Sequence, residues 1–302
     1  MEGLVIAGSN NFFTVERKDR KQFLCSIKGK VLKLNVNVYN PLCPGDIVEF
    51  EEVEEGKGVI TLLHTRKNVL NRLNIKTSNP QFLFSNVDLI LCVTTPSSPP
   101  FRPRFVDRVM VQAEKEGIPV VVVVNKIDLP SPTLMETRLS NWQEYDYEVL
   151  KISAKENINI EELRKRIKGL KIGVLGQSGV GKSSLLNALY PSLSLKTSII
   201  SYKYDRGMHT TTKGMLFKMD DGTVLIDTPG IRNFSLWDID EKELILYFPD
   251  MKEFEGKCKF GLSCKHEKEI GCQVLKALNE GKILYDRYES YLRIREEIIT
   301  RK

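Results

Sequence analysis

The segment Gly176-Gln177-Ser178-Gly179-Val180-Gly181-Lys182-Ser183 decides the fold class of this chain of 302 residues. It matches the pattern G-x-x-x-x-G-K-[ST] and lies between an apolar strand at 172–175 and a helix-forming stretch at 184–190, the context that a phosphate-binding P-loop requires. Its glycines let backbone N–H groups turn toward phosphates at a helix N-terminus. We expect Lys182 to neutralise the β and γ oxygens and the Ser183 hydroxyl to bind Mg²⁺. The nucleotide-contacting residues predicted in this segment are Gly176, Gln177, Ser178, Gly179, Val180, Gly181, Lys182, Ser183 and Ser184.

Two further motifs predict that the base is guanine. Asn125-Lys126-Ile127-Asp128 follows an apolar strand, so the Asp128 carboxylate can accept both the N1–H and the exocyclic N–H₂ of guanine, which adenine cannot offer together. Ser153-Ala154-Lys155 follows the next strand and can supply a backbone N–H to the guanine oxygen. An ATP site is therefore disfavoured.

A fourth motif, Asp227-Thr228-Pro229-Gly230, follows a strand at 223–226. It predicts an Asp227 carboxylate near Mg²⁺ and a Gly230 N–H near the γ-phosphate. Four such motifs at the ends of strands predict a GTPase, with Lys182 and Asp227 in its catalytic machinery.

The order of the four motifs is unusual. Conventional small GTPases begin with the P-loop, whereas here N-K-x-D and S-A-K precede it. Circular permutation of this kind is tolerable where chain termini lie near one another. The permuted order leads the loop after Gly230 directly into the C-terminal part of the chain. We expect loss of the γ-phosphate to move that part.

The chain on either side of these motifs changes its pattern twice. Continuous apolar runs alternate with helical stretches from about residue 86, which is typical of a doubly wound α/β domain. Alternating apolar and polar residues at 30–38, followed by Gly-containing turns, predict a small OB-type barrel before it. The predicted fold class is α/β: an OB-type β-barrel at 1–65, a circularly permuted P-loop GTPase domain at 66–240, and a C-terminal helical zinc-binding domain at 241–302.

The C-terminal part contains the metal-binding pattern Cys258-x₅-Cys264-x-His266-x₅-Cys272. Three thiolates and one imidazole form a closed ligand set, typical of structural zinc. Buried free thiols are the alternative. The other cysteines lack such a pattern: two lie in apolar strands and indicate core packing, and Cys43 lies at a turn without an evident partner.

Composition and charge exclude several classes of protein. Apolar residues at 41% and charged residues at 28% are ordinary for a globular chain, which excludes disorder and coiled coil as the main structure. No apolar run approaches the ~20 residues that span a bilayer, and the N-terminus lacks a signal peptide. We therefore expect a cytoplasmic protein without a membrane partner.

The formal charge of +6 arises entirely between residues 66 and 240, which carry 24 Lys+Arg and 18 Asp+Glu. A solvated surface and a phosphate-rich partner both explain such an excess. Its two basic clusters comprise Arg66, Lys67, Arg72 and Lys76, and then Arg102, Arg104 and Arg108.

The permuted motif order together with the Cys/His pattern resembles the bacterial GTPase family called RsgA or YjeQ, over the whole chain. The resemblance implies an OB-fold domain, a GTPase domain and a zinc-binding domain. It further implies late maturation of the 30S ribosomal subunit, binding of 16S rRNA, and GTP hydrolysis stimulated by the subunit. Contact with other assembly factors and a monomeric state are further expectations.

The residue that orients the attacking water differs from the one in conventional GTPases. Ile231 stands where Ras-like enzymes place a Gln, so slow intrinsic turnover is expected. His209 is the best replacement, and the family resemblance points to the same position; a surface or structural histidine is the alternative. One residue of Thr210–Thr212 should bind Mg²⁺ in the GTP state, and Thr211 and Thr212 are among the predicted nucleotide contacts.

The favoured function is therefore a 30S-stimulated GTPase that acts in subunit assembly, with Mg²⁺ at the nucleotide and one structural Zn²⁺ per chain. The alternative is an RNA- or partner-binding module that GTP switches, in which hydrolysis is incidental.

Overall fold

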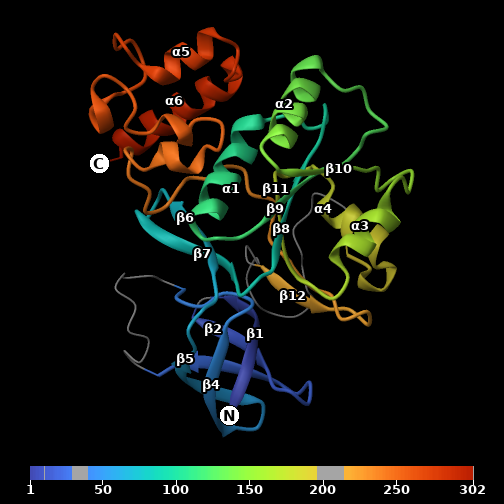
Figure 1. The fold of residues 1–302 in the computed structure, drawn as a ribbon. Helices are drawn as coiled ribbons and strands as arrows, with labels where there is room; N and C mark the ends of the chain where they lie inside the picture. The colour runs from blue at the N-terminus through green and yellow to red at the C-terminus, as the bar shows by residue number, and fades with distance from the viewer. Residues whose placement is uncertain (10, 29–39, 196–213, 302) are drawn as a thin grey trace.

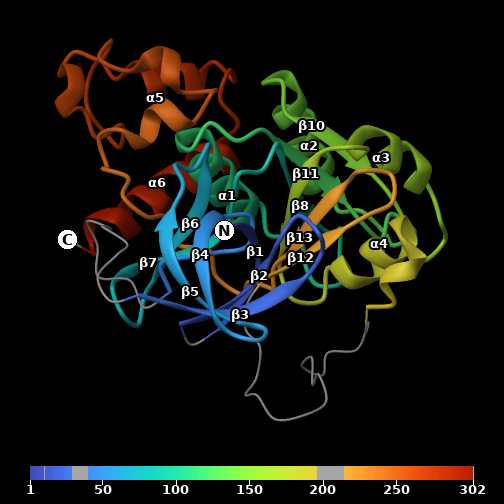
Figure 2. The same cartoon turned by 90° about the horizontal axis from the view of Figure 1, so that it is seen from below.

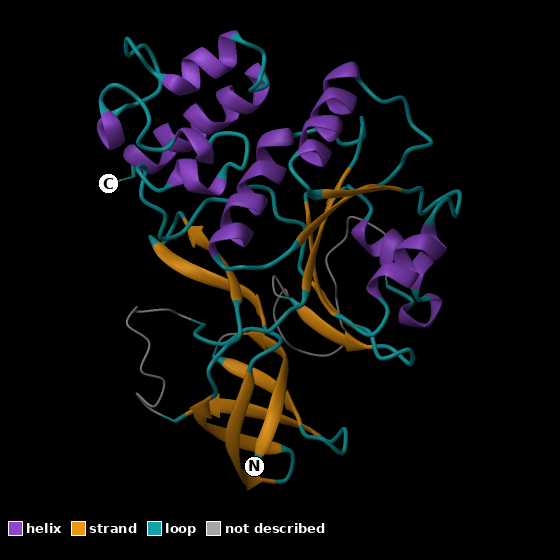
Figure 3. Cartoon of the chain, viewed as in Figure 1, coloured by secondary structure: helices purple, strands orange, loops and turns teal. Residues whose placement is uncertain are grey.

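The computed structural model describes residues 1–9, 11–28, 40–195 and 214–301, and Figure 1 shows three parts within them. A barrel of strands holds the N-terminus, a sheet flanked by helices follows, and the C-terminal helices pack beside the first helix of that central part (Figures 1 and 3). No helix among the described residues is long and apolar enough to cross a membrane. The predicted strand at 30–38 lies outside the described residues.

The strands are β1 (Glu2–Ser9), β2 (Phe12–Glu16), β3 (Gln22–Ile27), β4 (Ile47–Glu54), β5 (Lys57–Leu63), β6 (Val69–Asn74), β7 (Asn79–Ser85), β8 (Leu89–Thr94), β9 (Val120–Val124), β10 (Glu148–Lys151), β11 (Lys171–Gly176), β12 (Met215–Lys218) and β13 (Val224–Asp227). The helices are α1 (Pro103–Lys115), α2 (Thr133–Glu144), α3 (Ile160–Ile167), α4 (Lys182–Leu189), α5 (Gln273–Asn279) and α6 (Tyr285–Ile299), with short 3₁₀ turns η1 (Pro191–Leu193), η2 (Leu244–Tyr247), η3 (Lys252–Phe254) and η4 (Gly261–Ser263).

The first five strands close into a barrel. Their order is β1-β2-β3-β5-β4, β1 also pairs with β4, and β3 runs parallel to β5. Alternate residues point inward, so Phe13, Phe23 and Phe50 are fully buried in its core. Closure leaves no free sheet edge, and it confirms the predicted OB-type barrel.

The central sheet has the order β10-β9-β8-β11-β13-β12, in which only β12 is antiparallel to its neighbour. Strands β8 and β9 are buried along their whole length because helices cover both faces of the sheet. Successive side chains of β9 point to opposite faces of the sheet. Val122 packs into the core on the side of α1 and α2, and Val123 packs into the core on the side of α3 and α4. The predicted α/β domain is confirmed.

The barrel is joined to the central sheet at two places. Ala7 of β1 pairs with Met215 of β12, and Lys218 forms an ion pair with Glu16, so β12 lies beside β1 in Figure 2. The second place is the buried carboxylate of Asp46, which accepts hydrogen bonds from Arg66 at 2.7 Å, from Ser85 Oγ at 2.5 Å and from Cys43 N at 2.9 Å. These bonds fix the barrel relative to β7. The sequence indicated no partner for Cys43, and in the structure its backbone N–H donates to the Asp46 carboxylate.

A buried cluster of charges attaches the C-terminal helices to the central domain. Arg287 of α6 pairs with Asp107 of α1 and lies 4.4 Å from the centre of the Phe248 ring. Burial by itself raises the pKa of Asp107, but the adjacent Arg287 and Arg138 hold that pKa below its usual value. Asp107 therefore stays ionised inside the interface, where Arg138 and Asp250 extend the network of buried opposite charges.

The segment that follows the D-T-P-G motif is held in place on several sides. The Ser235 carbonyl accepts from Leu73 N at 2.9 Å, and Trp237 N donates to Gln112 Oε1 at 2.9 Å. Phe234 meets Phe105 of α1 edge to face. These contacts hold residues 234–237 against β6 and α1. Movement of the C-terminal part on loss of the γ-phosphate remains a prediction, as do the domain boundaries at 65/66 and 240/241.

Candidate nucleotide and metal sites

The predicted nucleotide residues lie at the carboxyl ends of the parallel strands. Register pairs Val174 with Asp227, Gly176 with Val93, and Val124 with both Thr94 and Lys151. The loops that leave β9, β10, β11 and β13 therefore begin at one edge of the sheet, where ligands of open α/β sheets bind.

The P-loop wraps the end of β11 and turns into α4. Gly181 precedes α4 with a φ of 88°, and a Cβ there would lie 2.5 Å from Asn125 Nδ2, so only glycine fits. Asn125 Nδ2 itself donates to the Val180 carbonyl at 3.0 Å. The N-K-x-D loop thus holds the P-loop through a backbone carbonyl, and backbone N–H groups of the P-loop are the groups expected to meet phosphates.

Hydrogen bonds to neighbouring loops fix the residues that are predicted to recognise the base. Lys126 Nζ donates to the Gly179 carbonyl at 2.8 Å and to the Ser98 carbonyl at 2.6 Å. Ser153 Oγ donates to Asp128 Oδ1 at 2.6 Å, and this bond lowers the pKa of Asp128, which keeps the carboxylate an acceptor for guanine.

The Ala154 N–H does not point to an open position. It donates to Asn125 Oδ1 at 3.0 Å, and Lys155 pairs with the neighbouring Glu156. The Ala154 N–H is thus engaged within the site, and the backbone N–H of this motif that meets the guanine oxygen remains a prediction.

Lys182 and Asp227 form the polar centre of the site. Lys182 is 8% exposed, and its Nζ donates to the Gly176 carbonyl at 2.9 Å. Burial lowers the pKa of Lys182, and burial raises the pKa of Asp227 to about 6, while the charge of Lys182 opposes that rise. Asp227 Oδ1 is buried and has no hydrogen-bond partner among the described residues. A buried carboxylate oxygen without a described hydrogen-bond partner fits the outer coordination of Mg²⁺.

The raised pKa of Asp227 predicts a pH-dependent stability of the protein without nucleotide or Mg²⁺. A carboxyl whose folded pKa is about 6, above its unfolded value, favours the folded state at low pH and loses that contribution as the pH rises through 6. Asp227→Asn should therefore raise the melting temperature by a few degrees at pH 8 and leave it nearly unchanged at pH 4. Differential scanning calorimetry checks this expectation. A lower melting temperature of the variant at pH 8 would contradict it.

The loop after Asp227 lies directly on the P-loop. A Cβ on Gly230 would lie 2.9 Å from Ser178 Cα, and Ile231 N donates to the Gly176 carbonyl at 3.2 Å. Thr228 Oγ1 donates back to Val174 at 2.8 Å. Glycine at 230 thus permits the contact between the two loops. The predicted residues His209, Thr211 and Thr212 lie outside the described residues.

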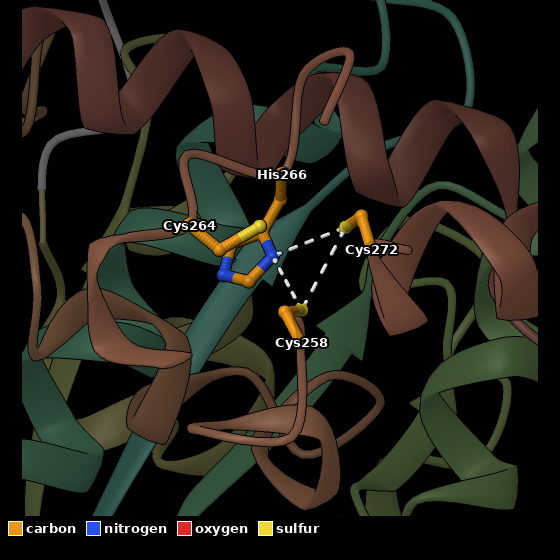
Figure 4. Close-up of side chains that lie close together, drawn as sticks. All are labelled: Cys258, Cys264, His266 and Cys272. Atoms are coloured by element: carbon orange, nitrogen blue, oxygen red, sulfur yellow. Dashed lines mark hydrogen bonds between the residues drawn. The ribbon is translucent and has the colours of Figure 1, made fainter. Parts of the chain in front are cut away.

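Four predicted metal ligands converge in the C-terminal part (Figure 4). The Sγ atoms of Cys258 and Cys272 lie 3.8 Å apart, and His266 Nδ1 lies 3.6 Å and 3.4 Å from them. With Zn–S bonds of about 2.3 Å, a tetrahedral site has S···S edges of about 3.8 Å, so the set, with Cys264, fits zinc.

The surroundings of the four ligands also suit a metal. Backbone N–H groups of Gln273 and Leu275 donate to the sulfurs of Cys258 and Cys272, at 3.3 Å and 3.4 Å. Such bonds stabilise thiolates and orient them. Without a metal, burial raises the pKa of Cys272 to about 12, so the thiol would stay protonated.

The sequence analysis did not identify Ser98, which lies beside Lys126 of the N-K-x-D motif. Ser98 supplies a carbonyl to Lys126, and its loop is closed by a bond of 2.8 Å from Thr95 Oγ1 to the Pro99 carbonyl. The Thr-Thr-Pro-Ser-Ser-Pro-Pro run after a buried strand was the available signal, since it marks a structured turn at the same sheet edge.

The fold and the motifs at the strand ends define a circularly permuted P-loop GTPase with an N-terminal barrel and a C-terminal Cys₃His cluster. The family model described as RsgA GTPase matches residues 63–237. The chain belongs to the RsgA GTPase family, and it is a hydrolase that acts on GTP.

Relatives and solved structures match nearly the whole chain. A protein of Flavobacterium psychrophilum named small ribosomal subunit biogenesis GTPase RsgA is 36% identical over 98% of this chain and 93% of its own length. A protein of the same name from Borreliella afzelii is 38% identical over 99% of this chain and 96% of its own. The crystal structure of YjeQ from Thermotoga maritima matches 100% of this chain and 99% of that chain, with a TM-score of 0.73 and 34% identity.

Proposed function

We propose that this protein hydrolyses GTP to GDP and phosphate during maturation of the small ribosomal subunit, and that the 30S subunit stimulates the reaction. The observation that carries the proposal is the near full-length match to proteins named small ribosomal subunit biogenesis GTPase RsgA. The buried P-loop Lys182 and the unpaired Asp227 oxygen support it, because they suit a bound nucleotide with Mg²⁺. Contacts with 16S rRNA and with other assembly factors, a monomeric state and a cytoplasmic location belong to the same proposal.

Each part of the proposed site has one task. Asp128 selects guanine, Lys126 holds the base side of the P-loop, and Lys182 neutralises charge on the transferred phosphoryl group. Ser183 with Asp227 would hold Mg²⁺, which would supply further positive charge to the phosphates. Among the residues predicted from sequence, His209 is proposed to orient the attacking water.

The Cys₃His set is proposed to hold one structural zinc ion. The closed ligand set leaves no open position for a substrate, which distinguishes it from a catalytic zinc site. The carbonyl of His266 accepts from the hydroxyl of Tyr288 at 2.6 Å, so the ligand loop is tied to α6.

Stimulation by the subunit is tested by single-turnover hydrolysis of GTP with and without purified 30S subunits, at two salt concentrations. We expect the rate to rise by about tenfold or more with 30S, which lowers the barrier by at least about 1.4 kcal/mol. The stimulation should weaken at higher salt, because contacts with RNA phosphates do. The matched His209→Ala variant should retain GTP affinity and lose most of the stimulated rate.

Two other results of that assay would count against parts of the proposal. GTP-dependent binding to 30S without any rise in rate would favour a switched binding module in which hydrolysis is incidental. Unchanged stimulation in the His209→Ala variant would remove His209 from its proposed role.

The preference for guanine is tested by Asp128→Asn. The variant should bind GTP about tenfold to a hundredfold more weakly, because hydrogen bonds to a charged acceptor are replaced by one neutral contact. Inosine triphosphate lacks the 2-amino group, so the preference for GTP over this analogue should shrink in the variant. Fluorescence titration measures both, with Asp220→Asn, an exposed carboxylate in a β12–β13 turn, as the matched control. Equal loss of affinity in both variants would contradict the assignment.

A further inference from the structure

A large cavity lies beside the D-T-P-G loop, and apart from that loop its lining has no role in the site described above. Its volume is about 930 Å³, and it is lined by the β6–β7 hairpin, the turn before β4, and residues 228–233. The hairpin lies between the barrel and the C-terminal helices in Figure 1. We call this space the hairpin cavity.

The lining of the hairpin cavity is positively charged. Arg72, Lys76 and Arg232 belong to it, and none of its described lining residues is Asp or Glu. Among the described residues, no carboxylate lies within ion-pair distance of these three cations, although most other arginines here are paired. An excess of charge inside a concave surface attracts an anion, because the low-dielectric walls reduce screening.

Arg72 is the most enclosed of the three cations. Its Nη1 donates to the Asn233 carbonyl at 2.6 Å, and its Nε donates to Gln81 Oε1 at 3.1 Å. Both acceptors are neutral, and burial lowers the pKa of Arg72 without a carboxylate to oppose it. The guanidinium is thus fixed in direction, and its positive charge is left for a ligand to compensate.

The position of the cavity indicates which anion it meets. Thr228–Ile231 form part of its wall, and the same loop touches the P-loop, where Gly230 lies against Ser178. Hydrolysis of GTP by water yields GDP, hydrogen phosphate and a proton. The phosphate is therefore released next to a loop that also lines the cavity containing Arg72 and Arg232.

We propose that the hairpin cavity binds inorganic phosphate, the product of GTP hydrolysis, through Arg72 and Arg232 beside the D-T-P-G loop. The inference rests on the proposed function for the source of the phosphate, but the binding itself needs no hydrolysis. Arg72 supplies a fixed fork of N–H donors, and Arg232, whose side chain is exposed, adds a second charge.

The test measures binding of inorganic phosphate by ³¹P NMR to the full chain loaded with Mg²⁺ and the non-hydrolysable analogue guanylyl imidodiphosphate, so that the γ-phosphate position is filled. We expect saturable binding that sulfate displaces. Arg232→Gln, which breaks no contact described here, should weaken it about tenfold, and Arg72→Gln by at least as much. Lys165→Gln, an exposed charge on α3, should leave it unchanged.

Every other outcome overturns the proposal. Absence of saturable binding, or equal weakening in Arg232→Gln and Lys165→Gln, would show that the cavity holds no phosphate. Loss of affinity for a single-stranded RNA oligonucleotide in the arginine variants, with no phosphate binding in the parent, would assign the cavity to a phosphodiester backbone instead. No GTP is hydrolysed in this binding assay, so its result is independent of the turnover assay with 30S subunits. Phosphate binding without stimulation by 30S would contradict only the proposed function. Stimulation by 30S without phosphate binding would contradict only this inference.

Discussion

Lys182→Ala is expected to lower the rate of GTP hydrolysis at saturating nucleotide by about a thousandfold. The Lys182 ammonium is almost completely buried and has no carboxylate as a hydrogen-bond partner among the described residues. Its charge is therefore available to the phosphates, and burial of the side chain limits screening by water. Removing one such preorganised donor from a transition state costs about 10²–10³ in rate. Quench-flow measurement of GDP formation checks the expected loss.

The stability of the variant must be separated from its catalysis. Lys182 donates to the Gly176 and Gln177 carbonyls, so the alanine variant loses those bonds as well. A matched Lys182→Arg variant keeps the charge but enlarges the side chain, and it should recover phosphate affinity only in part because the pocket was filled by a lysine. Turnover of Lys182→Ala within about tenfold of the parent would show that the charge is not used in the reaction.

Removal of the metal from the Cys₃His set is expected to unfold the C-terminal part of the chain. Structural zinc contributes about 10–16 kcal/mol in small domains, which is comparable with the whole stability of a typical protein. Cys258, Cys264 and Cys272 belong to the same apolar core as Met110 of α1 and Tyr291 of α6. Cys258→Ala should therefore bind no zinc, and hydrogen exchange should show lost protection at 241–302 and along α1.

The matched control is Cys25→Ala, which removes a thiol that is equally buried but lies in the barrel core. It should keep one zinc per chain by elemental analysis and lose protection only within the barrel. A Cys258→Ala variant that keeps its zinc or its protection at 241–302 would contradict the assignment of the metal site.

The central sheet was predictable because its motifs carry their own context. A P-loop requires a strand before it and a helix after it, and β11 and α4 lie there. The five consecutive valines of β9 are all buried, and such a continuous apolar run is typical of a strand in a sheet that is covered on both faces. The amphipathic helix α6 (Tyr285–Ile299) likewise covers a neighbouring domain, because Tyr288, Tyr291 and Ile294 are buried and the helix packs against α1.

The β6–β7 hairpin and the buried charges were not predictable, for a physical reason in each case. Buried and exposed side chains alternate only weakly along β6 and β7. Burial is instead concentrated at one end of the hairpin, where Leu70 and Phe84 are fully buried, and the residues toward the turn are exposed. Asp107 and Arg287 are 180 residues apart, and single charged residues normally predict a solvated surface. The basic cluster that starts at Arg66 illustrates the same limit. Arg66 forms an ion pair with the buried Asp46, whereas Arg72 donates to the neutral carbonyl of Asn233.

The pairing of Ala7 with Met215 has a consequence for truncated forms of the protein. It makes β1 the neighbour that covers the outer side of β12, which would otherwise end the central sheet. A chain that lacks the barrel would present β12 as a bare edge with unpaired N–H and C=O groups, a template on which other chains can add strands. The barrel thus also serves as a shield against aggregation, and the isolated GTPase domain is a poor substitute for the full chain in solution studies.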